Sequence, residues 1–418
     1  MNNTTTYKLG DIASFINGRA YSMPEMLHEG KYRIVRVGNF TGKDEWYYSN
    51  MELEPDKYCE KGDLLYKWAC TFGPEIWDEE KVIYHYHIWK VVPNEALVDK
   101  DYLYYLLGHM TAQWLKAVHG STMVHITKET MEQNIVTIPT DVSEQHVIAN
   151  VLKKIDAKIA NNNAICSNLE AMAKLLYDYW FVQFDFPDEN GKPYKSSGGK
   201  MVWNDELKRE IPEGWEVRRI GDIITTERGI SYGTPNIASG EGVPMLNLAT
   251  FMPGGGDYKA DGLKHFLGEY PKSKVLTPYD LIMCNTQQTA IKFETDIIGR
   301  SMLVPDVFDG DIVFSHHVNV IRPEMEEMKY HLLYLFNSDH FHKYISGFTN
   351  GTNILGLSFS GVEDYLTEIP PAALLKRFAD VVLACEKKKS EIILENQQLT
   401  ELRDFLLPML MNGQVKVG

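Results

Sequence analysis

Residues 10–21 read GDIASFINGRAY, and residues 221–232 read GDIITTERGISY. Gly, Asp, Ile, Gly and Tyr recur at the same places in the two stretches, which lie 211 positions apart in a chain of 418 residues. A repeat at this separation predicts two structural units that share one fold. The shared pattern is expected to be structural, with Asp capping or turning the chain and Gly permitting a bend.

Other segments of the first half recur, in the same order, in the second half. Their separation grows from 211 to 231 positions, so the extra residues of the second half lie in its middle. Matched ends around a variable middle indicate one scaffold that carries different loops. Three of the matched pairs are RIVRVGNF (33–40) with PMLNLATF (244–251), HIWKVVP (87–93) with HVNVIRP (317–323), and GSTMVHI (120–126) with GTNILGL (351–357).

Each half combines strand-like and helix-like patterns. Short β-branched and aromatic runs such as YRIVRV (32–37) and KVIYHYHIWKVV (81–92) predict strands. Helical periodicity follows in DYLYYLLGHMTAQWLKAV (101–118) and in KYHLLYLFNSDHFHKYI (329–345). Both halves are therefore expected to be mixed α/β domains.

A coiled-coil period follows each domain. From Ile148 to Trp180, seam residues recur in alternating steps of four and three, and the same seam recurs 230 positions later from Phe378 to Leu410. Each predicted helix of about 40 residues would be about 60 Å long. Asp141 is expected to cap the first helix, and Pro408 to bend or end the second.

If the two helices pair antiparallel, facing seam positions must sum to a constant. Registers that differ by seven residues align most seam layers, but a sum of 558 places Asn162 opposite Asn396. Two facing amides can satisfy each other, whereas one amide facing Leu would cost about 1–3 kcal/mol. The same register leaves Lys389 and Arg403 in the seam, where their side chains are expected to turn outward. The predicted fold class is α+β: two mixed α/β domains in pseudo-twofold tandem, joined by two long antiparallel coiled-coil helices.

The predicted boundaries follow these patterns, because Pro, Gly and Ser concentrate between the first helix and the second domain. They are the first domain over 1–142, the first long helix over 143–184, a linker over 185–214, the second domain over 215–371 and the second long helix over 372–413.

Composition excludes several functions. With 42 basic and 57 acidic residues, the formal net charge of −15 argues against coating nucleic acid by bulk positive charge, although local basic patches or a charged partner stay compatible. Five cysteines without metal-ligand or disulfide-framework spacing favour free thiols. No apolar run approaches the length of a membrane helix, and the start carries no signal region, so a soluble cytoplasmic protein without a membrane partner is expected.

Three strings resemble the specificity subunit of type I restriction–modification systems: YDYWFVQFDFP (177–187), GKPYKSSGGKMVWNDELKREIPEGW (191–215) and LLPMLMNG (406–413). The resemblance implies that each domain is a target-recognition domain reading one half of a split, asymmetric site in double-stranded DNA. It implies that the helices set the spacing and dock two copies of a DNA methyltransferase (modification) subunit, with restriction/translocase subunits added outside. S-adenosylmethionine is then expected on the methyltransferase, and no cofactor on this chain.

Two other function classes remain as alternatives, an endonuclease or fused restriction enzyme and a protein-only coiled-coil scaffold. The sequence has no GxxxxGK[ST] loop and no Asn/Asp-Pro-Pro-aromatic motif, which disfavours an enzyme. Pro55-Asp56 with Glu79-Glu80-Lys81 imitates a nuclease site, but WDEEK is typical of a solvated turn. His85-x-His87 lacks the further ligands of a metal site, so a scaffold role is favoured.

Three places are predicted to contact DNA, each with a structural alternative. Gly-Ser/Thr turns permit close approach to phosphates, although a polar turn before a strand is equally plausible. The amide run NTQQT (285–289) suits base edges, although a plain surface loop is nearly as plausible. The turn after GDI offers arginines. The candidate residues are Arg19, Lys67, Thr71, Gly120, Ser121, Thr122, His125, Arg228, Asn285, Gln287, Gln288, Thr289, Gly351, Thr352 and Asn353.

Overall fold

The computed structural model describes residues 4–42, 45–117, 126–238, 240–288 and 295–415. The chain divides into two compact units. Unit 1 contains residues 1–160 and 397–418, and unit 2 contains residues 161–396. Each unit therefore includes one segment of each long helix, and the units are described separately below.

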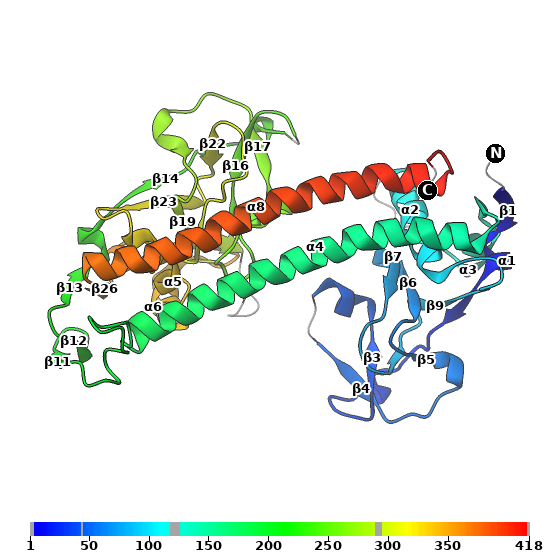
Figure 1. Cartoon of the computed structure of the whole chain (residues 1–418), viewed down its shortest axis with the longest axis horizontal. Helices are drawn as coiled ribbons and strands as arrows, with labels where there is room; N and C mark the ends of the chain where they lie inside the picture. The colour runs from blue at the N-terminus through cyan, green and yellow to red at the C-terminus, as the bar shows by residue number, and fades with distance from the viewer. Residues whose placement is uncertain (1–3, 43–44, 118–125, 239, 289–294, 416–418) are drawn as a thin grey trace. The chain divides into compact units, whose positions relative to one another are not determined.

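Unit 1 is built on two four-stranded sheets (Figure 1). The first sheet is antiparallel, with the order β2 (Ala13–Asn17), β9 (Ile88–Pro93), β6 (Leu64–Ala69) and β7 (Thr71–Ile76). The second has the order β4 (Tyr47–Ser49), β3 (Tyr32–Val35), β8 (Val82–Tyr84) and β5 (Tyr58–Cys59), with β3 and β8 parallel. The unit also contains the ladder of β1 (Thr4–Lys8) with β10 (Ile135–Pro139), and the helices α1 (Leu9–Ile12), α2 (Lys100–Ala117) and α3 (Lys128–Gln133).

Unit 2 repeats this plan with one additional strand in its second sheet. Its antiparallel sheet has the order β14 (Ile224–Arg228), β23 (Val318–Pro323), β19 (Leu281–Cys284) and β21 (Ser301–Leu303). The second sheet has the order β15 (Ile237–Ala238), β17 (Lys264–Phe266), β16 (Val243–Leu246), β22 (Ile312–Phe314) and β18 (Val275–Leu276), and β16 and β22 are again parallel. The ladder of β13 (Glu216–Arg219) with β26 (Leu366–Ile369) matches β1 with β10.

Unit 2 also contains elements that cover or extend its sheets. They are the helices α5 (Met328–Phe336), α6 (Asp339–Ser346) and α7 (Ser360–Glu363), the hairpin of β11 (Met201–Asn204) with β12 (Arg209–Pro212), and a sheet of β20 (Thr286–Gln288), β25 (Ile354–Leu357) and β24 (Thr349–Asn350). The predicted mixed α/β character of both halves is thus confirmed.

The repeated glycine serves a close backbone approach in both units. A Cβ on Gly18 would lie 2.4 Å from the carbonyl oxygen of Tyr84, and a Cβ on Gly229 would lie 2.3 Å from that of Phe314. No side chain fits at such distances. The GDI-x5-G pattern is therefore required by the packing of each unit's backbone.

The long helices are α4 (Val142–Tyr177), which continues into a π-helical turn over Asp178–Val182, and α8 (Ala372–Met411). The Asp141 side chain accepts a hydrogen bond from the Ser143 backbone N–H at 2.8 Å and so caps the start of α4. Helix α8 continues past Pro408 to Met411, so this proline does not end the helix.

Within unit 2, α4 and α8 run antiparallel. Asn162 donates a hydrogen bond to the Asn396 side chain at 2.9 Å, while Trp180, further along α4, packs against Phe378 near the start of α8. The Asn162 side chain is 1% exposed and also donates to Glu395 at 2.8 Å. These polar contacts lie in the helix seam, where the two amides face each other.

The two cationic seam residues behave differently from each other. In unit 1, Arg403 is partly exposed and reaches Asp156 on α4 at 3.0 Å. In unit 2, the prediction that Lys389 turns outward is wrong, because its side chain is 4% exposed. Lys389 instead lies 2.9 Å from Glu386 and 3.3 Å from Asp257, a residue of a loop that packs on the helices. Two carboxylates therefore stabilise the buried Lys389 ammonium, which would be solvated by water if the side chain turned outward.

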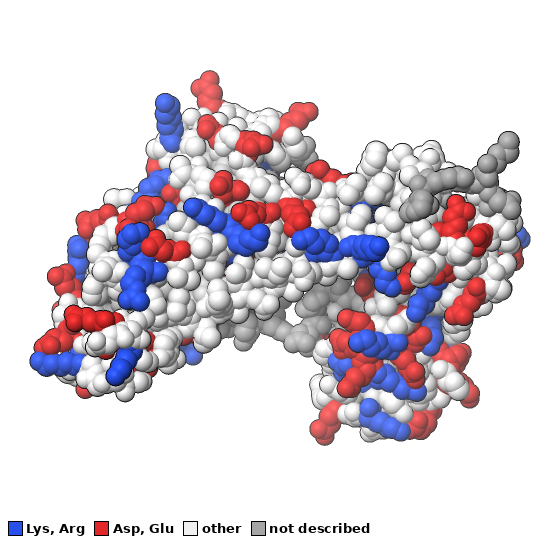
Figure 2. Space-filling view, viewed as in Figure 1, with Lys and Arg blue, Asp and Glu red and all other residues white. Residues whose placement is uncertain are grey.

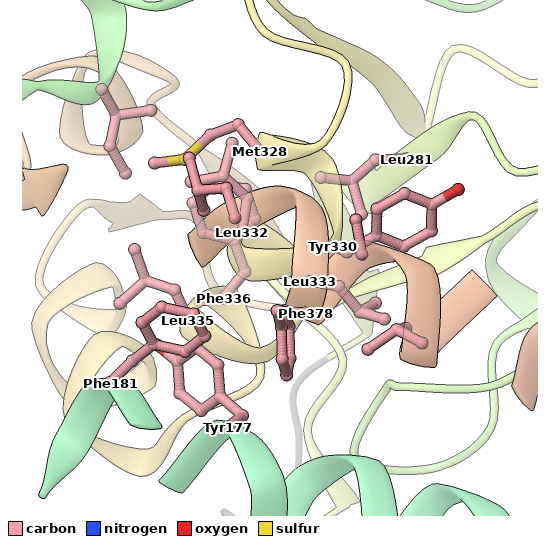
Figure 3. Packing of buried hydrophobic residues seen from close by; sticks show 14 of the residues in the cluster. Tyr177, Phe181, Leu281, Met328, Tyr330, Leu332, Leu333, Leu335, Phe336 and Phe378 are labelled. Atoms are coloured by element: carbon pink, nitrogen blue, oxygen red, sulfur yellow. The ribbon is translucent and has the colours of Figure 1, made fainter. Parts of the chain in front are cut away.

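The largest core cluster of unit 2 joins both helices to the domain. Figure 3 shows Tyr177 and Phe181 from the end of α4 and Phe378 from α8 packed against the side chains of α5. Phe181 and Phe378 meet edge to face with ring centroids 5.0 Å apart. The same cluster encloses His331, whose ring centroid lies 4.7 Å from that of Phe181. This core fixes the domain to its own helix segments.

Candidate nucleic-acid interface

Two of the predicted contact segments of unit 2 lie side by side. Strand β20, which carries the NTQQT amides, pairs antiparallel with β25, which follows the Gly-Thr-Asn turn. The register places Thr286 opposite Gly356. The structure therefore brings together residues that are far apart in the sequence.

A hollow of about 250 Å³ lies beside this strand pair. Arg228, at the end of β14, also lines the hollow, so residues of two predicted contact places, the amide run and the turn after GDI, meet there. The Gly-Thr-Asn turn itself does not line the hollow. The complete lining is Arg228, Asn285, Thr286, Asn319, Gly356, Leu357 and Phe359.

Hydrogen bonds to one carbonyl fix the polar side chains of the hollow. The backbone carbonyl of His316 accepts from Asn285 Nδ2 at 3.2 Å and from Arg228 Nε at 2.6 Å. Asn285 Nδ2 also donates to Asn319 Oδ1. Because the His316 carbonyl can only accept, it determines which way the Asn285 amide faces, and Asn285 then orients Asn319.

The other predicted residues of unit 2 differ in their surroundings. Gln287 is buried, and its Oε1 accepts from the backbone N–H groups of Ile297 at 2.8 Å and Ile298 at 3.1 Å, which favours a structural role. Thr352 and Asn353 are exposed between β24 and β25, next to Gly351. Gln288 is described only as part of β20, and Thr289 lies outside the described residues.

Unit 1 has a hollow of about 410 Å³ at the tips of its strands. Of the predicted residues, Thr71 lines it, beside Cys70 at the β6–β7 hairpin. Six other polar side chains line it, namely Arg36, Asn39, Thr41, Glu45, His85 and His87. The cation, the amide, the two hydroxyls and the two imidazoles suit phosphate or base-edge contacts, whereas the Glu45 carboxylate suits only a base amino group.

The other predicted residues of unit 1 are paired or lie elsewhere. Lys67 is nearly buried, with its ammonium 2.9 Å from Glu75. Arg19 forms an ion pair with Glu25 at 2.6 Å. Both cations are therefore already neutralised by carboxylates. Gly120, Ser121, Thr122 and His125 lie outside the described residues.

Two imidazoles, His85 at the hollow of unit 1 and His317 beside the hollow of unit 2, are held neutral at physiological pH. Burial, together with the neighbouring His87, lowers the pKa of His85 to about 4. Burial, His316 and Arg228 lower the pKa of His317 to about 4 as well. His317 Nδ1 is hydrogen bonded to Thr286 Oγ1 at 2.6 Å. Each neutral ring has one donor nitrogen and one acceptor nitrogen and adds no charge.

Several contributors were not predicted as DNA contacts from the sequence, among them Arg36, Asn39 and Asn319. Asn319 interrupts the apolar strand HVNVIRP, and an amide inside a buried strand is a signal that could have identified it. Arg36 and Asn39 lie in RIVRVGNF, where nothing in the sequence separates them from ordinary surface residues.

The nuclease alternative gains no support from the geometry. Asp56 pairs with Lys57, Glu79 with Arg33, and Lys81 with Glu60, so these charges are held by other partners. Among the described residues, no group of three His, Cys, Asp or Glu side chains could hold a metal ion. None of the helices within the described ranges is long and apolar enough to span a membrane.

Comparison with known proteins identifies the family. The model of the type I restriction modification DNA specificity domain matches residues 1–171 and 212–402. The MjaIX specificity subunit of Methanocaldococcus jannaschii is 28% identical over 78% of this chain and 71% of its own length. The HindI specificity subunit of Haemophilus influenzae is 22% identical, with coverage of 99% and 100%.

A solved structure shows the same fold. The S subunit of a type I restriction–modification system from M. genitalium superposes with a TM-score of 0.54 at 16% identity, covering 98% of this chain and 96% of that one. Because the family model matches most of both halves, this chain belongs to the type I restriction–modification DNA specificity family.

Proposed function

We propose that this chain is the non-catalytic subunit that reads a bipartite, asymmetric site in double-stranded DNA, one half with each domain, for a type I restriction–modification complex. One observation carries the proposal: the same backbone frame presents different side chains in the two units. Trp68 and Trp89 stack in unit 1 with ring centroids 5.7 Å apart, whereas Asn285 and Asn319 occupy the corresponding strand positions in unit 2. A shared frame with different side chains is what two readers of different sequences require.

The domains proposed as readers span residues 1–142 and 215–371, with the long helices over 143–184 and 372–413 and a linker over 185–214 between them. Within them, the proposed contacts are centred on the two hollows. In unit 2 the main proposed contacts are Arg228 and Asn285, which line the hollow, and in unit 1 the main one is Thr71. Thr352 and Asn353 are proposed as further contacts because they are exposed next to β25.

Two copies of a methyltransferase subunit are the proposed protein partners, with restriction/translocase subunits beyond them. An exposed apolar pair on each long helix supports this number. Met172 and Leu175 on α4 are 51% and 67% exposed, and Leu402 and Phe405 on α8 are 45% and 63% exposed. The two pairs are 230 positions apart, the separation of the helix repeat. Repeated apolar pairs on a solvent-facing side suit two copies of one partner.

Net charge supports the division of labour. Acidic and basic side chains alternate over the visible face in Figure 2, and the chain as a whole carries −15. Such a chain attracts phosphates weakly by itself. The methyltransferase would therefore supply positive charge as well as the S-adenosylmethionine chemistry.

The test measures DNA binding by the purified chain with and without its methyltransferase, on DNA that carries the site methylated in the host. Alone at physiological salt, the chain should bind weakly and with little preference, and the complex should bind tightly and specifically. Tight, specific binding by the chain alone would overturn the division of labour. Equal binding of the complex to scrambled DNA would overturn the proposed function itself.

A further inference from the structure

The hollow of unit 2 holds hydrogen-bond donors that have no partner within the described ranges of the chain. Arg228 donates through Nε to the His316 carbonyl, and no acceptor among the described residues engages its two Nη atoms. Asn319 accepts through Oδ1 from Asn285, which turns its Nδ2 away, and this Nδ2 likewise meets no acceptor in the described part of the chain. Because acidic residues are in excess in this chain, an arginine such as Arg228 that pairs with no carboxylate of the described residues is available for a ligand.

These donors are held in place before any ligand arrives. The His316 carbonyl anchors both Arg228 and Asn285. The backbone carbonyl of Arg228 itself accepts from Lys274 Nζ at 2.6 Å, and Lys274 is ion-paired with Glu227. A donor that is already oriented loses little conformational entropy on binding.

Unit 1 contains the same anchors around different side chains. The carbonyl of Tyr86, which corresponds to His316, accepts from Trp68 Nε1 at 2.9 Å. The carbonyl of Asn17, which corresponds to Arg228, accepts from Lys57 Nζ at 3.0 Å, as that of Arg228 does from Lys274. Unit 1 therefore forms the same backbone arrangement with neither an arginine nor a pair of amide side chains at these positions.

It follows that packing does not require Arg228, Asn285 and Asn319. Their equivalents in unit 1 are Asn17, Trp68 and Trp89, and the scaffold accommodates both sets. Side chains that vary within a constant frame, and that leave donors unpaired in a hollow, are expected to serve a ligand.

We infer that Arg228 and Asn319 read a guanine in the half-site bound by unit 2, through its N7 and O6 atoms. The inference rests on the proposed function. Guanine presents two adjacent acceptors in the major groove, which match a site that offers donors and positive charge. Adenine and cytosine each present an amino group, which is a donor and cannot bond to the donors of Arg228 and Asn319. Thymine presents only one acceptor, beside a methyl group. Asn285 and the His316 carbonyl act as positioning groups.

A backbone phosphate is the other acceptor-rich, anionic ligand of DNA, and the experiment separates the two. The host site is first identified by mapping methylated bases. Binding of the complete complex is then measured on that site, and on sites in which each guanine of the half read by unit 2 is replaced in turn by 7-deazaguanine. This analogue keeps its pairing but lacks the N7 acceptor.

With the unaltered chain, one replacement should weaken binding roughly 10- to 100-fold. Arg228→Ala and Asn319→Ala should lower affinity for the natural site and abolish the effect of that replacement. Arg228→Lys should behave like Arg228→Ala, because a lysine cannot form the bidentate contact. Asn190→Ala, which removes an exposed linker amide, is the control and should bind like the unaltered chain.

The guanine assignment is overturned if Arg228→Ala weakens binding equally on all sequences and Arg228→Lys restores it, since that pattern belongs to a phosphate contact. It is also overturned if that half-site contains no guanine, or if 7-deazaguanine has no effect at any position. If methylation of the host DNA did not depend on this chain, the proposed function itself would be contradicted. Retained binding to the other half-site shows that a variant is folded.

Discussion

At the scale of single residues, the repeated glycine is the position where sequence and packing are most tightly linked. Gly18→Ala should destabilise unit 1 by about 2–3 kcal/mol, because its Cβ would overlap a carbonyl oxygen at 2.4 Å. Gly108→Ala in α2 is the matched control, since its Cβ would meet Pro74 at an ordinary 3.7 Å. The control should be neutral or stabilising by about 0.5–1 kcal/mol. Urea denaturation of both variants decides, and equal losses would contradict the packing argument.

His331 makes the stability of unit 2 depend on pH. Its ring is buried and has no hydrogen-bond partner among the residues that the structure describes, and burial lowers its pKa from 6.5 to about 3. Below pH 6.5 His331 is protonated in the unfolded chain but stays neutral in the folded chain, so the free energy of unfolding decreases as the pH drops toward 3. His331→Phe should remove this loss, about 1.4 kcal/mol per pH unit within that range. Denaturation curves at pH 4.5 and 7 test it; an identical pH dependence of the two proteins would refute it.

At the scale of elements, the Asn162–Asn396 contact should couple the two helices. Asn162→Leu alone leaves the Asn396 amide facing an apolar group and should cost about 1–3 kcal/mol. Replacing both asparagines with leucine should raise stability above either single variant while loosening the register. A double-mutant cycle is the measurement, with an expected coupling of about 1–2 kcal/mol. Simple additivity of the two changes would show that the contact is unimportant.

The buried charges around Lys389 predict the opposite pH dependence to His331. Burial and the nearby Asp257 raise the pKa of Glu170 to about 7. The folded chain therefore binds the extra proton, and this group's contribution to stability is present below pH 4.5 and is lost as the pH rises through 7. Glu170→Gln should stabilise unit 2 more at pH 8 than at pH 5. Thermal unfolding at both values checks this, and a larger gain at pH 5 would contradict it.

The seam also shows how far the sequence leads. Periodicity predicted both long helices, because it depends on local spacing alone. The spacing allowed several registers, and the facing asparagines were preferred because two amides can satisfy each other. The burial of Lys389 could not be predicted, since its partner Asp257 comes from a loop distant in the sequence. The hollow of unit 2 was predicted in part: Arg228 and Asn285 stood out as polar residues, but Asn319 became recognisable only when strand pairing placed it beside them.

At the scale of the whole molecule, the repeated apolar pairs predict the number of partners. Leu175→Glu should remove one methyltransferase copy, Phe405→Glu the other, and the double variant both, because each charge would be buried on docking. Leu267→Glu, at an apolar residue with 41% exposure outside the helices, is the control and should leave both copies bound. Analytical ultracentrifugation gives the stoichiometry. Full assembly of the double variant would rule out these pairs as the docking surface.

The central claim is that the two domains read DNA independently within one frame. The most direct test exchanges residues 252–350 for the corresponding middle of another family member and maps every methylated base in the host genome. We predict that the half-site read by unit 2 changes, while the other half-site and the methylated base within it stay the same. A change in both halves, or in neither, would contradict the account.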